Sequence, residues 1–384
     1  MRVVIILIYL DNAATSAQKP LIVFGKLFKE SLFTSINAGR GAHRKSLKAI
    51  EGINKTAELT AKLFNISDSS RIAFLPNATY ALNLGILGVL KPDDHVIVTS
   101  MEHNSVLRPV TQKGNFTVVP ADNDGFVPPE HIEQAIRPST TLIVCTHASN
   151  VCGTVQDAEA IGKIAKKHKI LFMLDCAQTA GCMKIDAEKI GADMIAFSGH
   201  KGIMGPLGTG GLYVSPEIEL SPVITGGTGS FSESLIQPSV MPDMLHSGTM
   251  NAPAIMALGT AIECISDYTD EIFLYERKLA ESFIEDLKNM NNIYIYGTDL
   301  KNRNGTVSFN IKNTDPAEIE DYFDREKKII IRSGYHCAPL AHKTLGTEKT
   351  GTARVSFGYY STDKHRKAAS DAVYDFMKSK NMVW

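Results

Sequence analysis

Short runs of apolar residues recur along the first half of the chain, and stretches with helical periodicity separate several of them. The runs are four or five residues long, and many are bounded by Gly, Pro, Asn or Asp, a pattern typical of strands. Some are apolar at every position, which indicates strands buried on both faces of a sheet. We therefore predict strands at 72–75, 95–99, 116–119, 141–145, 171–175, 194–197 and 210–214.

Amphipathic stretches lie between several of these strands, for example at 78–90 and 158–168. Strands that alternate with helices in this way predict an α/β fold, in which helices cover both faces of a largely parallel sheet. The chain should therefore contain a large domain built on a mainly parallel, seven-stranded sheet.

The pattern changes beyond about residue 252. A mixture of helices and strands there predicts a smaller α+β domain. Its expected elements are a long helical region at 254–288, strands at 293–296, 306–311, 328–331 and 354–357, and a final helix at 363–378. We expect a large domain at 15–252 and a small domain formed by 1–14 together with 253–384.

Composition places the chain among ordinary globular enzymes. It has 384 residues, of which 44% are hydrophobic and 21% charged, and its formal net charge is −1. This balance gives no general attraction to nucleic acid or to an anionic membrane. No apolar stretch reaches the length of a membrane helix, and the apolar start at 1–10 is not followed by a cleavage site. We therefore expect a cytoplasmic protein.

Six cysteines are spread along the chain without a CxxC pair, and no Cys/His spacing suggests a metal site, so we expect no metal. Most lie in apolar surroundings, where cysteine packs as a small hydrophobe. Cys337 differs, because Arg332, Gly334, His336 and Pro339 surround it in the sequence. A polar segment with nearby cations is what a reactive thiol requires. Cys337 is thus a candidate nucleophile, and the alternative is an unreactive loop thiol.

A lysine follows the apolar strand at 194–197, in the segment Ser198-Gly199-His200-Lys201. Ligands of open α/β sheets bind at the carboxyl ends of strands, so Lys201 should project into a crevice there. The glycine-rich stretch at 202–211 keeps bulky side chains away from it. Most lysines are solvated surface charges, but a lysine amine in such a crevice can form a Schiff base with a carbonyl cofactor.

An acid, Asp175, ends the apolar strand at 171–175. A buried carboxylate is costly unless it is paired. The ring nitrogen of pyridoxal phosphate (PLP) would be a suitable partner, because a carboxylate keeps that nitrogen protonated and makes the ring an electron sink. An Asp at a strand end commonly caps the next helix instead. Asp175 and Gln178 are followed by Lys201 after the next strand. This order is a more specific signal for a PLP site than the aspartate or the lysine alone.

These motifs resemble those of fold-type-I PLP enzymes of the class V aminotransferase family. Within that family, they are most similar to the group of cysteine desulfurases and selenocysteine lyases. The resemblance covers nearly the whole chain and implies a PLP-dependent transferase fold with the two domains described above. The matching motifs are Tyr9-Leu10-Asp11-Asn12-Ala13-Ala14-Thr15, Met101-Glu102-His103-Asn104-Ser105, Ser149-Asn150-Val151-Cys152-Gly153-Thr154, Ser198-Gly199-His200-Lys201, Gly248-Thr249-Met250-Asn251 and Arg332-Ser333-Gly334-Tyr335-His336-Cys337-Ala338.

The resemblance implies roles for five residues toward the PLP ring. Lys201 would carry the cofactor and Asp175 would pair with the ring nitrogen. His103 would stack on the ring, as an aromatic face can. Asn150 and Gln178 would reach the ring hydroxyl oxygen.

Four further residues are implied at the cofactor phosphate. Thr79 begins a helix, whose N-terminus suits an anion. Ser198 and His200 would add donors from the same chain. Thr249 would reach the phosphate from a neighbouring subunit, which implies a homodimer. Arg354 matches the arginine that grips the substrate carboxylate, for which a bidentate guanidinium is the natural partner.

The chain departs from the family pattern at several positions. Ala78 stands where relatives offer a second hydroxyl for the phosphate. Tyr335 stands where many relatives have a His, so proton handling around the thiol is expected to differ. Arg40 and His43 match only loosely a segment near the substrate entrance of the family.

The resemblance implies a cysteine desulfurase that converts L-cysteine to L-alanine and leaves the sulfur as a persulfide on Cys337. His336 and Arg332 are expected to stabilise its thiolate, and a sulfur-acceptor protein is an expected partner. A selenocysteine lyase or another class V lyase or transaminase would use Lys201 and Asp175 equally. A further alternative is a protein without activity that uses the PLP fold as a sulfur-carrier scaffold.

Overall fold

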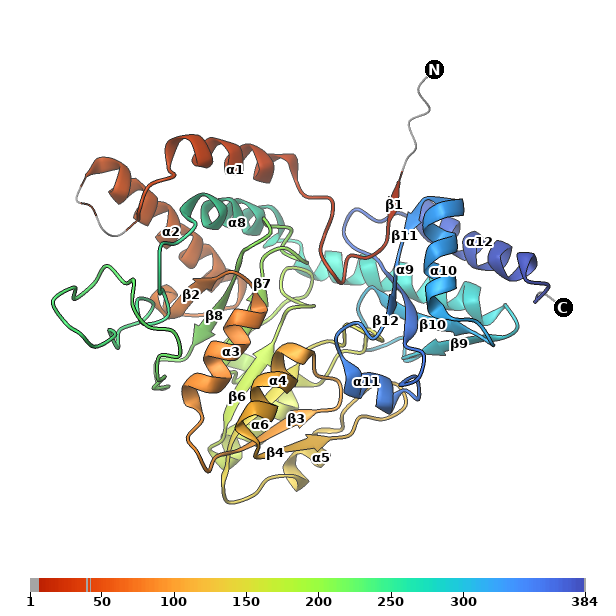
Figure 1. Cartoon of the computed structure of the whole chain (residues 1–384), viewed down its shortest axis with the longest axis horizontal. Helices are drawn as coiled ribbons and strands as arrows, with labels where there is room; N and C mark the ends of the chain where they lie inside the picture. The colour runs from red at the N-terminus through yellow and green to blue at the C-terminus, as the bar shows by residue number, and fades with distance from the viewer. Residues whose placement is uncertain (1–6, 39–40, 42, 383–384) are drawn as a thin grey trace.

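The computed structural model describes residues 7–38, 41 and 43–382. Its largest element is a seven-stranded sheet with the order β2-β8-β7-β6-β5-β3-β4 (Figure 1). Only β8 is antiparallel to its neighbours, so the mainly parallel sheet predicted from the sequence is confirmed. The strands are β2 (Ile72–Leu75), β3 (His95–Thr99), β4 (Phe116–Val119), β5 (Thr140–Thr146), β6 (Leu171–Asp175), β7 (Met194–Ser198) and β8 (Gly210–Val214).

Successive side chains of the central strands enter two different hydrophobic clusters. In β6, Phe172 and Leu174 pack in one cluster, and Met173 packs in the other. Because neighbouring side chains of a strand point to opposite faces, both faces of the sheet are buried. The first face is covered by α1 (Leu21–Phe33), α2 (Arg44–Leu63), α6 (Ala158–His168), α7 (Ala187–Ile190) and α8 (Ala252–Ile265), and the second by α3 (Ala78–Val89) and α4 (Asn104–Lys113).

A smaller, four-stranded antiparallel sheet with the order β12-β13-β10-β9 lies beside the large one, at the right of Figure 1. A short parallel pair, β1 with β11, joins the start of the described chain to this region. The strands are β1 (Ile8–Tyr9), β9 (Ile293–Tyr296), β10 (Thr306–Ile311), β11 (Ile329–Ile330), β12 (Arg332–Gly334) and β13 (Thr352–Ser356). The helices of this part are α9 (Thr269–Lys288), α10 (Pro316–Tyr322), α11 (Pro339–Thr344) and α12 (Asp363–Ser379).

The remaining elements are short. They are a helix α5 (Pro129–Gln134), a 3₁₀ turn (Ser69–Arg71) and a π-helical turn (Phe323–Lys327). Among the helices that the structure describes, none combines the length and the apolar character needed to cross a membrane.

The long helical region expected at 254–288 is confirmed, and the structure divides it into two helices. α8 ends at Ile265 and α9 begins at Thr269, with Asp270 and Glu271 in its first turn, where acidic residues are favourable. α8 belongs to the core of the large sheet, whereas α9 packs in the core of the small sheet. We therefore propose that the boundary between the domains lies at this break rather than at residue 252.

The parallel register brings several strand ends to one edge of the large sheet. Thr146 of β5 pairs with Asp175 of β6, which in turn pairs with Ala196 of β7. Ser198 ends β7 at the same edge. Because parallel strands share one direction, the segments after β5, β6 and β7 all emerge there and can build one site.

Tight contact between α6 and α7 yields a stability prediction. A Cβ at Gly162 would overlap the carbonyl oxygen of Ile190, and backbone atoms cannot rotate away. We expect Gly162→Ala to lower the free energy of unfolding by about 1–3 kcal/mol, as overpacking does. Gly25→Ala in α1 is the matched control, since a Cβ added there would meet no atom within 4 Å and alanine favours a helix. Urea unfolding of both variants tests this, and equal stabilities would contradict it.

Candidate active site

A pocket of about 310 Å³ opens at the carboxyl edge of the large sheet, where the small sheet meets it. It collects residues that are far apart in the sequence. Nine of the residues predicted from the sequence line it, namely Thr79, His103, Asn150, Asp175, Gln178, Ser198, His200, Lys201 and Arg354.

Asp175 lies at the base of this pocket and is almost fully buried. One of its carboxylate oxygens accepts the backbone N–H of Ala177 at 2.9 Å, and the other has no hydrogen-bond partner among the described residues. Burial raises the pKa of Asp175, while that N–H and the charge of Lys201 act against the rise. A cation in the pocket would therefore complete the environment of this carboxylate.

A second buried carboxyl, Glu102, lies close to the first. It accepts hydrogen bonds from the hydroxyl of Thr99 at 2.6 Å and from the backbone of Thr146 at 2.9 Å. Burial, with a contribution from Asp175, raises the pKa of Glu102 to about 8, so this group is neutral at pH 7. Glu102 therefore adds little negative charge to the pocket, and Asp175 is the carboxyl that faces a ligand.

Lys201 follows β7 and lines the same pocket. Burial lowers its pKa to about 8, and Arg354 and Arg332 contribute in the same direction while Asp175 opposes them. The amine is thus much easier to deprotonate than that of a solvated lysine. A neutral amine is the form that attacks a carbonyl group or accepts a proton.

The orientation of His103 is fixed by the start of α4. Its Nδ1 accepts the backbone N–H of Ser105 at 3.1 Å and lies 2.9 Å from the hydroxyl of the same residue. Burial, aided by Lys201 and the arginines, lowers the pKa of His103 to about 4, so the ring is neutral at pH 7. A neutral imidazole held by its cap hydrogen bond can present one flat face to the pocket.

Asn150 and Gln178 both use their side-chain amides to bind backbone carbonyls. The Nδ2 group of Asn150 donates to His336 at 2.6 Å, and the Nε2 group of Gln178 donates to Ala13 at 3.0 Å. Each amide nitrogen carries a second hydrogen. Both residues can therefore hold a neighbouring chain segment and still donate to a ligand.

One end of the pocket is rich in hydrogen-bond donors. The hydroxyl of Thr79, in the first turn of α3, lies 2.7 Å from that of Ser105, and the hydroxyl of Ser198 accepts the backbone N–H of Ala78 at 3.4 Å. His200 Nδ1 lies 3.1 Å from the hydroxyl of Thr15. A helix N-terminus surrounded by hydroxyls suits a phosphate group. Ser105 thus adds a hydroxyl at this end of the pocket, next to that of Thr79.

Arg354 of β13 is 1% exposed and closes the pocket from the small sheet. Its Nη2 forms an ion pair with Asp11 at 2.5 Å, and its Nη1 donates to the backbone carbonyl of Asn150 at 2.8 Å. Its Nε has no partner among the described residues. A guanidinium carries five N–H donors, and these two contacts use two of them, so donors remain for an incoming carboxylate.

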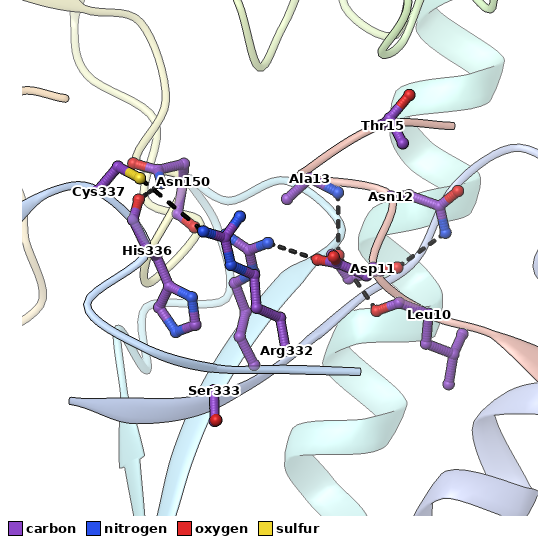
Figure 2. Close-up of polar contacts among 12 residues, drawn as sticks. Leu10, Asp11, Asn12, Ala13, Thr15, Asn150, Arg332, Ser333, His336 and Cys337 are labelled. Carbon is purple, nitrogen blue, oxygen red and sulfur yellow. Dashed lines mark hydrogen bonds and ion pairs between the residues drawn. The ribbon is translucent and has the colours of Figure 1, made fainter. Parts of the chain in front are cut away.

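Cys337 is exposed and does not line the pocket itself, although its neighbours Arg332 and His336 do. The Nη2 group of Arg332, which does line the pocket, is 3.8 Å from its sulfur (Figure 2). Arg332 forms no ion pair with any described carboxylate. Its charge is therefore available to a thiolate, as the sequence led us to expect.

The two residues that precede Cys337, His336 and Tyr335, bind other parts of the protein. His336 is buried, its Nε2 lies 3.1 Å from both the carbonyl and the hydroxyl oxygen of Thr352, and burial lowers its pKa well below the usual range. His336 thus supports the loop as a neutral group. The hydroxyl of Tyr335 donates to the backbone carbonyl of Glu348, so this departure from the family pattern does not place a hydroxyl on the thiol.

Two motifs that matched the family lie away from this pocket. Thr249 is exposed and does not line the pocket of its own chain, so its expected contact with a second subunit stays a prediction. His43 accepts the backbone N–H of Ser46 at 3.2 Å and caps α2. Arg40 lies outside the described residues.

Three contributors were not predicted as site residues, namely Asp11, Ser105 and Glu102. Each lies within a motif that the sequence shares with the family, which was the available signal. The partner of Asp11, Arg354, is 343 residues away and cannot be recognised from a local pattern.

Comparison with known proteins shows the family to which the chain is related. A model of the family Aminotransferase class-V matches residues 8–366. A "Probable cysteine desulfurase" of Methanothermobacter thermautotrophicus is 36% identical over 93% of this chain and 91% of its own length. The apo structure of a cysteine desulfurase from Thermococcus onnurineus NA1 superposes with a TM-score of 0.91 at 31% identity, covering 97% of this chain and 95% of the other.

A second solved structure, the cysteine desulfurase CsdA (S-sulfonic acid) from Escherichia coli, gives a TM-score of 0.88 at 25% identity and covers 97% of this chain and 95% of the other. The match of the family model extends from β1 to α12 and includes every residue that lines the pocket. The chain therefore belongs to the class V aminotransferase family.

Proposed function

We propose that the protein is a PLP-dependent cysteine desulfurase, in which L-cysteine and the thiol of Cys337 yield L-alanine and a persulfide on Cys337. The observation that carries this proposal is the position of Cys337. An exposed thiol lies 3.8 Å from a guanidinium nitrogen of Arg332, which lines the same pocket as Lys201 and Arg354. The names of the relatives described above support the same reaction.

The residues of the pocket fit PLP. Asp175 has one carboxylate oxygen without a partner among the described residues, which suits a protonated ring nitrogen. Lys201 offers an amine with a lowered pKa for the aldehyde, and His103 offers a neutral ring for stacking. Asn150 and Gln178 keep one amide hydrogen each for the ring oxygen. When bound, PLP would supply an electron sink for the charge that forms at the substrate Cα.

The phosphate of the cofactor would lie at the N-terminus of α3. Thr79, Ser198 and His200 provide the donors there, and Ser105 adds a hydroxyl 2.7 Å from that of Thr79. Thr249 from a second subunit would complete this end of the site.

Two residues of the chain act on the carboxylate and the Cα proton of the substrate. Arg354 binds the carboxylate of L-cysteine through N–H donors that its contacts with Asp11 and Asn150 leave unused. Lys201 accepts the proton of Cα, which a neutral amine with a pKa of about 8 can do near neutral pH. Binding of the carboxylate at Arg354 orients this proton toward Lys201, because both residues line one pocket.

Cys337 takes the sulfur. Its thiolate forms a bond to the substrate sulfur while the bond from that sulfur to Cβ breaks, and the electrons of the broken bond remain with the carbon skeleton that becomes alanine. Arg332 stabilises the negative charge on sulfur before the attack. The exposure of Cys337 leaves the persulfide accessible to a sulfur-acceptor protein.

A homodimer would supply Thr249 to the site, and the surface of the chain supports this. Two segments expose large apolar side chains, namely α1 and the loop at 223–240, drawn in green at the left of Figure 1. Leu235 and Ile236 are 104% and 81% exposed, and Leu21 is 86% exposed. Apolar surface of this extent is typical of an interface. We infer that a second copy covers it.

The first prediction concerns the cofactor. Borohydride reduction of the purified protein should attach a phosphopyridoxyl group to the peptide that contains Lys201. Lys201→Arg should abolish this adduct, because Lys201 is the lysine of the described chain that lines the pocket. Lys19→Arg is the matched control, since burial also lowers the pKa of Lys19 to about 8 and its amine binds Ser16 and the His200 carbonyl instead. An adduct mapped to Lys19 would refute the assignment.

The second prediction tests the function. Cys337→Ser should bind PLP normally but form no persulfide, and sulfide release from L-cysteine should fall to background, because serine cannot accept the sulfur. Cys264→Ser removes the other cysteine that is not buried and should keep the parent rate. Cleavage of L-selenocysteine should survive better in Cys337→Ser, since selenium leaves without help from a thiolate. Sulfide release at the parent rate by Cys337→Ser would exclude the mechanism.

The third prediction concerns assembly. Sedimentation velocity at micromolar concentration should give twice the chain mass of 41.9 kDa. Replacing Leu235 and Ile236 together by Glu should shift the protein toward monomer and weaken cofactor binding, because the Thr249 donor is lost. Tyr294→Glu, at an exposed aromatic position in β9, should leave the dimer intact. A monomer with full activity would rule out the shared site.

A further inference from the structure

The loop that carries Cys337 adopts an unfavourable backbone conformation. His336 and Cys337 have φ angles of +47° and +60°, so two consecutive residues other than glycine occupy the left-handed region. This region is sparsely populated by such residues. It persists only where the surrounding structure holds the backbone in place. The position of the Cys337 sulfur therefore depends on the groups that hold this loop.

Three groups from other segments hold it. The backbone N–H of Asn104, at the start of α4, donates to the Cys337 carbonyl at 2.8 Å. Thr352 of β13 binds the imidazole of His336. The side chain of Asn150 donates to the carbonyl of His336 at 2.6 Å. Of these three, Asn150 is the side-chain donor that belongs to the wall of the pocket.

Asn150 is placed to connect three parts of the site. Its side chain is 8% exposed and lines the pocket together with Asp175 and Lys201. Its backbone carbonyl accepts the Nη1 of Arg354 at 2.8 Å. Its amide hydrogen bond ends on the residue directly before Cys337, and Figure 2 shows Asn150 beside His336 and Cys337. Asn150 thus contacts the arginine proposed to bind the substrate carboxylate, lines the pocket and binds the loop that carries Cys337.

We propose that Asn150 is a positioning residue that holds the Cys337 loop in its left-handed conformation through the His336 carbonyl. The amide gives one hydrogen to this carbonyl and keeps the other for the pocket, so a single rigid group sets the thiol relative to whatever the pocket binds. The catalytic importance of this tether rests on the proposed function, whereas the tether itself does not.

Hydrogen–deuterium exchange tests the tether directly. Asn150→Asp has the same shape but replaces the donor by an acceptor, and Asn150→Ser is too short to reach the carbonyl. In both variants, exchange of the backbone amides at 334–338 and 340 and of Asn104 should be about five- to tenfold faster, as expected for the loss of one hydrogen bond. Measurements with and without added PLP separate this effect from a change in cofactor occupancy.

Gln178→Glu is the matched control. It makes the same amide-to-acid change in the same pocket, but Gln178 holds the Ala13 carbonyl and not the Cys337 loop. Exchange of the loop should therefore stay within about twofold of the parent in this variant, since its hydrogen bonds are untouched. If Gln178→Glu loosens the loop as much as the Asn150 variants do, the effect belongs to the pocket as a whole and the proposal fails.

The remaining outcomes are also decisive. Parent-like loop exchange in Asn150→Ser, whether or not Asn150→Asp folds, overturns the tether. In the active enzyme, Asn150→Ser should lower L-cysteine turnover more than L-selenocysteine cleavage, while Gln178→Glu should lower both alike. If the parent protein forms no persulfide but its loop loosens in the Asn150 variants, the proposed function fails and the tether stands.

Discussion

A guanidinium that is almost completely removed from water must be paired, and in this protein the pairing of Arg354 joins three separate segments of the chain. β13 carries the arginine, Asp11 supplies the counter-charge from the start of the described chain, and Asn150 supplies a carbonyl from the loop after β5. Removing one partner of such a buried pair commonly costs about 3–5 kcal/mol, because the other charge stays buried. The relative position of the two sheets, and hence the pocket between them, depends on this contact.

The side chains that line the pocket carry more positive than negative charge. Arg332, Arg354 and Lys201 face it, whereas Asp175 is the acidic residue in its wall and Glu102, just behind, is neutral at pH 7 because burial raises its pKa to about 8. The balance favours anions. A substrate carboxylate, a phosphate group and a thiolate at Cys337 all carry the sign of charge that this pocket stabilises.

The sequence predicted the large sheet well, since strands buried on both faces are apolar runs with clear ends. Five of the seven strands have the predicted bounds, and the ends of β5 and β7 differ by one residue each. Prediction was weaker where structure depends on distant contacts. β12 consists of Arg332, Ser333 and Gly334, which show no strand pattern, and it forms because β13 pairs with it. The break between α8 and α9 was not predicted either, because residues 266–268 between them contain no Gly or Pro, and it is packing that separates the two helices.

The site shows the same division between local and distant information. Lys201 and Asp175 could be found from the sequence, because a polar residue at the end of an apolar strand is a local signal. The family resemblance added residues such as Arg354 and Asn150, which have no such signal, and the structure brings all four into one pocket. Neither source could reveal that Asp11 pairs with Arg354, since 343 residues separate them.

The proposed function would place two opposing demands on Cys337. Its thiol would have to reach a substrate in a largely buried pocket and also stay exposed to pass the sulfur on. The left-handed turn at His336 and Cys337 leaves the thiol exposed and in contact with Arg332, which lines the pocket. Such a turn is unfavourable by itself and needs support from the surrounding structure. Asn104, Asn150 and Thr352 provide this support through their hydrogen bonds to His336 and Cys337.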